Sequence, residues 1–433
     1  MKTRVVLLFL LALLAFCVAA PAAPALPGTL MYAKTWSSAA VGNISGAHVA
    51  VAPSGDVYVA ASAEHGVTDI DFLVARYTSA GARKWVRFYA EKGPDWLNGV
   101  ATDRAGNVFL CGKSRVSGSD NDFLTVKFSR AGKRLWVRRV GSAAGGSEAR
   151  DLATDGSGNV YVTGSVFRQA TGWDWYTVKY SPSGAKLWER YYSASTTKFE
   201  EGEALAWGPD GRLYVAGEAG EIGDLGTDLC VRRYSTSGHL DWTRRQGTPG
   251  LDDLANDIAV RTAGICVVGE ALDGGLRQGL VWKLTLAGVG SPLTVDAGSG
   301  ASYKYKRAGI DRYGNLVAAG SITSMGNTLF WVKRYRADGG SETTYEAAGG
   351  TLPGSANGLA VTGDGTIYVT GSVSTPATMT DVFSLCLSSS WVRLFAKYWD
   401  VELDSGDDLA LVPGAFYVGG VMDGRLLLLK YER

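Results

Sequence analysis

A glycine in a turn-like sequence recurs eight times along the chain, at intervals of 49 to 53 residues. The glycines are Gly55, Gly106, Gly158, Gly211, Gly264, Gly314, Gly365 and Gly414. The residues around them are also similar: 99–114 read GVATDRAGNVFLCGKS, 151–166 read DLATDGSGNVYVTGSV and 358–373 read GLAVTGDGTIYVTGSV. Self-similarity at such a period is typical of a chain in which one supersecondary unit packs on the next. The repeat therefore outweighs the expectation, from length alone, of two or three unrelated domains.

Each unit contains four strand signals. In the third unit, for example, they fall at residues 152–153, 160–163, 174–180 and 187–188, and glycine turns separate the first pair and the last pair. Alternating apolar and polar residues bounded by Gly, Asp and Ser indicate strands, and no helical period of useful length is present. Four-stranded antiparallel sheets bury both faces when they stack around a ring. We therefore predict an all-β, eight-bladed β-propeller of four-stranded antiparallel blades, with seven blades as the alternative count.

The two ends of the chain predict how the ring closes. The last unit offers only three strands, at residues 408–412, 416–421 and 425–431. Residues 28–37 (GTLMYAKTWS) match the fourth strand of other units, such as 132–141 (GKRLWVRRVG). Pairing of the N-terminal strand with the C-terminal blade would complete the eighth blade and remove two exposed sheet edges. Residues 28–433 are thus expected to form a single propeller domain.

The first 25 residues resemble a signal peptide. Lys2 and Arg4 precede an apolar run from Val5 to Phe16, and small residues follow it. The run is too short to span a bilayer, and no later stretch approaches eighteen apolar residues. We expect a secreted, periplasmic or cell-surface protein with a bacterial-type signal peptide, no transmembrane segment and a monomeric state. Whether Cys17 carries a lipid stays open.

Charge and cysteine content indicate which partners to expect and where the cysteines lie. The 43 Lys and Arg balance 42 Asp and Glu, so no nucleic-acid partner is expected. The remaining cysteines each sit within an apolar strand signal, which favours small buried side chains, although an exported protein could pair them. These cysteines are Cys111, Cys230, Cys266 and Cys386.

The repeat strings resemble a known family. Residues 158–165 (GNVYVTGS), 177–192 (TVKYSPSGAKLWERYY) and 125–136 (TVKFSRAGKRLW) are similar to the SBBP beta-propeller repeat, which occurs in exported bacterial proteins. The resemblance implies a propeller fold and an exported setting, and it implies no shared catalytic residues. More distantly, the Ser-x-x-Gly-x-x-Leu-Trp string at 181–188 resembles the repeats of quinoprotein-like eight-bladed propellers. Those enzymes use a pair of adjacent cysteines, which this chain lacks.

Sequence motifs for catalysis or cofactors are missing. Only His48, His65 and His239 are present, and they show no metal-ligand spacing. No phosphate-binding glycine pattern is found, so no cofactor and no metal is expected. The Asp-x-x-Gly-Asn turns, as at residues 103–107, fit Asx turns better than calcium loops. The repeated tryptophans, such as Trp136, are interpreted as packing between blades.

The register of the repeat predicts where a ligand would bind. The residue seven before each turn glycine opens the innermost strand, so this residue and the one before it should ring one mouth of the central channel. Variable polar residues on a repeated scaffold are suited to binding. The candidate ligand-binding residues are His48, Asn98, Arg150, Asp151, Glu203, Asn256, Asp257, Lys306, Arg307, Asn357, Asp407 and Asp408. In this scheme the aspartates accept hydrogen bonds from a ligand, and the arginines bind an anion.

Two functions remain open on these residues. The first is a non-catalytic binding or scaffold protein for a protein partner or a surface glycan. The alternative is a polysaccharide hydrolase or lyase that uses two channel-mouth carboxylates as acid and base. Because no convergent catalytic set is visible, we interpret the sequence as that of a binding protein and name no catalytic residue.

Overall fold

The structure is a computed structural model. It describes residues 28–433 except 67–68, 92, 116–119, 142–144, 195–198, 221–225, 249, 292, 299, 339–340, 347–352, 375–379 and 400–403. The expected signal peptide and Cys17 lie outside the described residues. Within the described ranges there is no helix of the length and hydrophobicity needed to cross a membrane.

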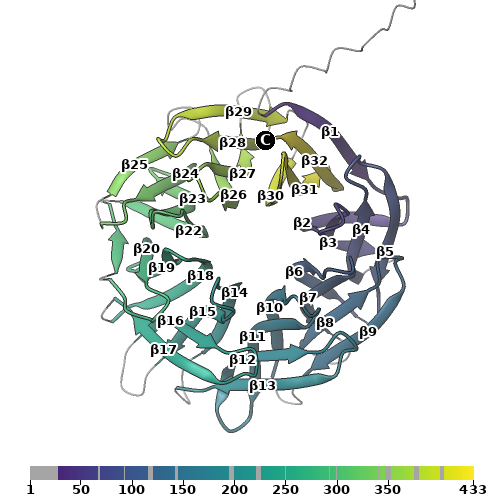
Figure 1. Ribbon diagram of the computed structural model, residues 1–433, viewed down its shortest axis with the longest axis horizontal. Helices are drawn as coiled ribbons and strands as arrows, with labels where there is room; N and C mark the ends of the chain where they lie inside the picture. The colour runs from purple at the N-terminus through teal and green to yellow at the C-terminus, as the bar shows by residue number, and fades with distance from the viewer. Residues whose placement is uncertain are drawn as a thin grey trace, which may run out of the picture.

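In the described residues, thirty-two strands form eight four-stranded antiparallel sheets arranged as a ring (Figure 1). Blades one to four are β2 (Val41–Val51), β3 (Val57–His65), β4 (Asp69–Tyr77), β5 (Arg83–Tyr89); β6 (Asp95–Thr102), β7 (Val108–Ser114), β8 (Asp122–Phe128), β9 (Arg134–Val140); β10 (Ser147–Thr154), β11 (Val160–Arg168), β12 (Gly172–Tyr180), β13 (Lys186–Tyr192); and β14 (Glu201–Trp207), β15 (Leu213–Gly220), β16 (Thr227–Tyr234), β17 (Leu240–Gln246). Blades five to eight are β18 (Asp252–Arg261), β19 (Gly264–Asp273), β20 (Leu276–Leu284), β21 (Thr294–Asp296); β22 (Ala301–Ile310), β23 (Leu316–Ser324), β24 (Asn327–Tyr335), β25 (Ser341–Glu346); β26 (Gly354–Val361), β27 (Ile367–Val373), β28 (Asp381–Leu387), β29 (Arg393–Trp399); and β30 (Asp404–Val412), β31 (Ala415–Met422), β32 (Arg425–Glu432) with β1 (Leu30–Trp36). The eight-bladed count is confirmed.

The ring closes as the ends of the sequence predict. Strand β1 is the outer strand of the eighth blade and pairs antiparallel with β32, from Leu30 opposite Tyr431 to Trp36 opposite Leu426. Figure 1 shows β1 beside β32 although they come from opposite ends of the chain. Two further backbone hydrogen bonds join Gly28 and Thr29 to Glu432. The pairing therefore covers the backbone edge that β32 would otherwise expose.

Apolar side chains are buried mainly between neighbouring blades. One core cluster joins Tyr58 and Phe72 of the first blade to Leu110 and Leu124 of the second. A second cluster joins the fourth and fifth blades in the same way. This arrangement gives each sheet two covered faces, which a single blade could not achieve. The four cysteines expected in the core are buried and unpaired: Cys111, Cys230, Cys266 and Cys386.

The repeated tryptophans join the outer strands of adjacent blades. Trp136 is 8% exposed, and its indole Nε1 donates to the carbonyl oxygen of Pro182 in the next blade at 3.1 Å. A Cβ on Gly184 would lie 2.9 Å from that indole ring, and Gly184 also has φ +84°. Glycine is therefore required at position 184 for two reasons, its backbone conformation and the close approach of the Trp136 ring. Trp85 and Trp188 make the equivalent hydrogen bond, as the packing interpretation predicts.

The Asp-x-x-Gly-Asn turns are Asx turns, as expected. In the third blade the carboxylate of Asp155 accepts hydrogen bonds from the backbone and the side chain of Asn159 at 3.0 and 2.7 Å. Asp103 and Asp311 hold Asn107 and Asn315 in the same way. These oxygens accept hydrogen bonds within the turn, which fixes the hairpin between the first two strands of the blade.

Candidate functional site

A β-bulge interrupts the innermost strand of every blade. The pairing register of β10 with β11 skips one residue between Ala149 and Asp151, so Arg150 is the extra residue. A bulge bends its strand and re-aims a side chain. The same single-residue shift makes the bulged residues of the other blades Asn98, Glu203, Asn256, Lys306, Asn357 and Asp407. In the first blade the shift spans Gly46 and Ala47.

The bulges correct one part of the sequence interpretation. The candidate ring was expected to open the innermost strands, but β10 begins at Ser147 and β30 at Asp404, each three residues before its bulge. The sequence pattern gave no sign of the extra paired residues, because the additional residue of a bulge breaks the period-two alternation by which a strand is recognised. The ring therefore lies within the strands, on the wall of the channel.

The candidate residues converge on one cavity of about 220 Å³ inside the ring. It is bounded by the innermost strands of seven blades, which surround the centre of the molecule in Figure 1. Of the predicted residues, the cavity is lined by His48, Asn98, Arg150, Asp151, Glu203, Asn256, Asp257, Arg307 and Asp408.

Three predicted residues do not line this cavity. Lys306 donates from Nζ to the side-chain oxygen of Asn357 at 2.8 Å, and Asn357 in turn donates to the carbonyl oxygen of Gly406 at 3.2 Å. Asp407 accepts from the backbone N–H of Ala47 at 2.9 Å and lines a separate cavity of about 320 Å³. These contacts cross between blades, so all three residues help to join them.

Three of the ring aspartates bridge adjacent blades, an arrangement called here the inter-blade clamp. Asp151 accepts from the backbone N–H of Leu152 in its own strand at 2.7 Å, and from that of Leu205 in the next blade at 2.9 Å. Asp257 bridges to Ala308 in the same manner, with both distances 2.8 Å. The third clamp, Asp408, joins the eighth blade to Val49 of the first at 3.0 Å.

Two of the clamp carboxylates sit in an environment that opposes ionisation. Burial raises the pKa of Asp151 to about 7, and its two backbone hydrogen bonds offset only part of that rise. Burial likewise raises the pKa of Asp257, which Arg307 partly offsets. For His48, burial lowers the pKa more than the nearby Asp408 carboxylate, 3.9 Å away, raises it. The cavity wall therefore favours the uncharged forms of Asp151, Asp257 and His48.

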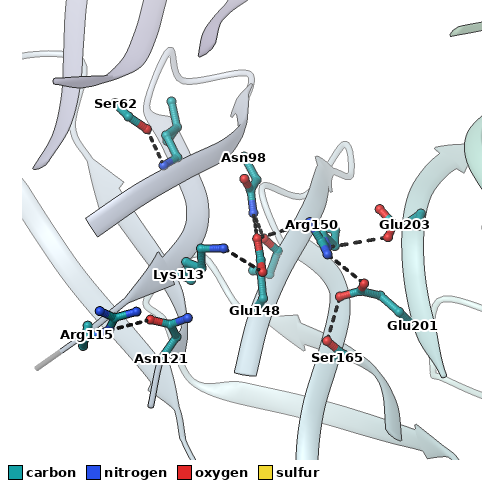
Figure 2. A network of polar contacts seen from close by, with 12 residues as sticks. Ser62, Asn98, Lys113, Arg115, Asn121, Glu148, Arg150, Ser165, Glu201 and Glu203 are labelled. Atoms are coloured by element: carbon teal, nitrogen blue, oxygen red, sulfur yellow. Dashed lines mark hydrogen bonds and ion pairs between the residues drawn. The ribbon is translucent and has the colours of Figure 1, made fainter. Parts of the chain in front are cut away.

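A network of charges occupies one side of the ring (Figure 2). Arg150 makes ion pairs with Glu201 at 2.9 Å, Glu148 at 3.3 Å and Glu203 at 3.6 Å. The other contacts of Glu148 are an ion pair with Lys113 at 3.1 Å and a hydrogen bond from Asn98 at 2.8 Å. Arg150 was expected to bind an anionic ligand, and it is already surrounded by protein carboxylates.

Two buried glutamates of this region were not among the candidate residues predicted from the sequence. Glu201 is 1% exposed and Glu218 is 5% exposed, and they lie directly opposite each other on β14 and β15. One carboxylate oxygen from each, and one from Glu203, lie within 4.8 Å of one another. The acidic run at residues 200–203 was the available signal. Its convergence with Glu218 depends on the bulge, which the sequence does not reveal.

Comparison with known proteins supports the fold. Residues 135–165 match the SBBP beta-propeller repeat, and residues 208–243 match DUF5122, a beta-propeller domain of unknown function. None of the curated proteins matches the sequence. These matches confirm the expected resemblance to the SBBP repeat.

Solved propellers are similar in structure but not in sequence. Sqt1 from Chaetomium thermophilum has a TM-score of 0.57 at 11% identity, over 94% of this chain and 100% of that chain. A puromycin hydrolase has a TM-score of 0.50 at 14% identity over 91% of this chain, which spans only 62% of the hydrolase. Identities this low show the fold alone. The chain is thus an eight-bladed β-propeller, of which residues 135–165 match the SBBP beta-propeller repeat.

Proposed function

We propose that the protein is an exported, non-catalytic binding propeller that acts as a monomer. It takes up an acidic group of a protein partner or a surface glycan at the polar wall of its channel. The observation that carries the proposal is that some polar residues of the ring join blades, whereas others line the cavity. Three carboxylates that could serve as acid or base are held by backbone N–H groups of two blades each. The cavity is also lined by His48, Glu203 and Arg307, and such varied polar residues on a repeated scaffold suit recognition of a ligand.

Arg307 is the best candidate for the anion-binding group. Arg307 lines the channel cavity. Among the described residues, its guanidinium donates one hydrogen bond, to the carbonyl oxygen of Lys306 at 3.1 Å. Arg150, in contrast, is shared among three glutamates. A guanidinium with unused donors can bind a carboxylate, sulfate or phosphate through two parallel hydrogen bonds.

The test compares two arginine variants. Arg307→Met keeps much of the apolar stem and removes the donors. Arg312→Met makes the same change in the hairpin turn that follows β22, outside the residues that line the channel cavity. Thermal-shift measurements against acidic and neutral polysaccharides, and pull-downs from the surface fraction of cells, would use both. We expect a ligand that Arg307→Met loses and Arg312→Met retains. Equal binding by both variants would refute the role of the channel.

One observation favours the alternative function, a polysaccharide hydrolase or lyase. Burial raises the pKa of Asp151 to about 7, which suits a general acid at neutral pH, and Glu203 lines the same cavity. The reaction would be seen as the release of reducing ends or unsaturated sugars from a polysaccharide. Turnover that Asp151→Asn abolishes, while binding persists, would replace the non-catalytic proposal.

A further inference from the structure

Glu201, Glu203 and Glu218 form a cluster of carboxylates whose geometry fits a single cation. Glu201 and Glu203 come from β14, and Glu218 comes from the adjacent β15. One oxygen of each lies within 4.8 Å of the others. Oxygens bound to one calcium ion at about 2.3–2.6 Å can be no more than about 5 Å apart, so all three can reach a common ion.

The charge of the cluster is not balanced by the side chains that contact it. Glu148, Glu201, Glu203 and Glu218 are four carboxylates, and among the described residues the cations that form ion pairs with them are Lys113 and Arg150. When all are ionised, two negative charges remain. Like charges opposite each other in a sheet are destabilising, and Glu201 faces Glu218 directly. A divalent cation would neutralise the remaining charge.

Glu218 supplies an independent observation. Its side chain is 5% exposed, and among the described residues its Oε2 atom has no hydrogen-bond partner. A buried carboxylate oxygen without a partner is costly, and proteins normally satisfy such a group with a donor or a metal ion. The same side chain approaches the two other carboxylates. The unpartnered Oε2 atom is therefore available to coordinate a cation.

The contacts of the other two carboxylates leave room for coordination. Glu201 accepts from Ser165 Oγ at 2.7 Å and from Arg150 at 2.9 Å, one contact per oxygen, so each oxygen retains a lone pair (Figure 2). Glu203 is a quarter exposed and also lines the channel cavity. Water entering from the channel could supply the remaining oxygen ligands that calcium requires.

We propose that Glu201, Glu203 and Glu218 constitute a calcium site in the fourth blade, open to the channel through Glu203. Calcium is favoured over magnesium because three protein carboxylates converge. Magnesium keeps several waters and uses one or two carboxylates, whereas calcium accepts a flexible cage of protein oxygens. The site is independent of the proposed function, because cation binding is measured with no partner present.

The experiment is isothermal titration of chelator-treated mature protein with CaCl₂ and with MgCl₂. Glu218→Gln is the test variant because it keeps the shape of the side chain and removes its charge. Glu270→Gln is the matched control, since it makes the same change at the equivalent position of β19 in the fifth blade, where Glu270 pairs with Arg277. We expect one calcium ion per chain, at least tenfold weaker binding by Glu218→Gln, and affinity within twofold of wild type for Glu270→Gln.

Thermal melting separates loss of the site from loss of folding. Without calcium, Glu218→Gln should melt at or above the wild-type temperature, because it removes an unbalanced buried charge. Calcium should raise the melting temperature of the wild type and of Glu270→Gln but not that of Glu218→Gln. Absence of binding to the wild type, equal affinity for magnesium, or unchanged calcium affinity in Glu218→Gln would each overturn the proposal.

Discussion

The clamp at the closing seam gives the most direct test of how the ring is held together. Asp408 accepts two backbone hydrogen bonds, one from Leu409 at 2.8 Å in its own strand and one from Val49 at 3.0 Å in the first blade. A hydrogen bond to an ionised group contributes about 1.5–3 kcal/mol, and the one-quarter exposure of this side chain lowers that value. Asp408→Ala should therefore reduce the free energy of unfolding by about 2–4 kcal/mol. Asp408→Asn keeps one acceptor oxygen and should lose about half as much.

Urea unfolding followed by circular dichroism measures this loss. The control is Glu432→Ala, which removes a carboxylate from the same blade where no side-chain hydrogen bond to a described residue is found. The midpoint should fall for Asp408→Ala with an unchanged slope, since the surface exposed on unfolding stays the same. If Asp408→Ala and Glu432→Ala unfold at the same urea concentration, the carboxylate does not join the blades.

Three further predictions follow from the fold. Deleting Thr29–Trp36 removes a strand that completes the eighth blade, so the melting temperature should drop sharply, and an unchanged melt would contradict closure by pairing of the termini. Gly184→Ala places a Cβ 2.9 Å from the Trp136 ring, whereas Gly211→Ala, at a similar positive φ, places its Cβ within 4 Å of nothing. Gly184→Ala should therefore lower the free energy of unfolding by about 1–3 kcal/mol more than Gly211→Ala. Equal losses of stability would exclude the packing explanation. Burial raises the pKa of Asp95 to about 7, above its unfolded value, so this residue should lower the stability of the wild type by at most about 4 kcal/mol as pH rises from about 4 to 7, whereas Asp95→Asn should show a flatter pH profile and be more stable at pH 8.

The blade architecture could be predicted because its determinants are local. The turn glycines have positive φ, as at Gly158 with +77°, and the tryptophan motif requires a nearby glycine, as with Trp136 and Gly184. Both features repeat in the sequence at the period of the blade. The residues of the channel cavity were also identified by register, since nine of the twelve proposed side chains line it.

The chemistry of those residues could not be predicted because it depends on contacts between blades. Arg150 was interpreted as an anion-binding group, but its partner Glu201 lies 51 positions away in the next blade. Asp257 was expected to accept hydrogen bonds from a ligand, and its second acceptor oxygen is used by Ala308 of the following blade. Neither partner is visible within a single repeat.

Several ring positions are held by contacts between blades. At the position of the clamp aspartates, Gly358 replaces aspartate in the seventh blade, and a Cβ there would lie 3.0 Å from the backbone nitrogen of Leu409 in the neighbouring blade. At Gly99 a Cβ would lie 3.0 Å from the Cδ2 atom of the Leu152 side chain. Aspartate thus joins two blades through a bridging carboxylate, and glycine allows two blades to approach closely. The bulge residue just before this position also bonds across blades, as Asn256 does from its side-chain amide to the carbonyl oxygen of Tyr305 at 2.7 Å. Changes at these bridging residues should therefore act first on stability, and specificity for a ligand should be sought in a cavity residue such as Arg307, whose hydrogen bond stays within its own strand.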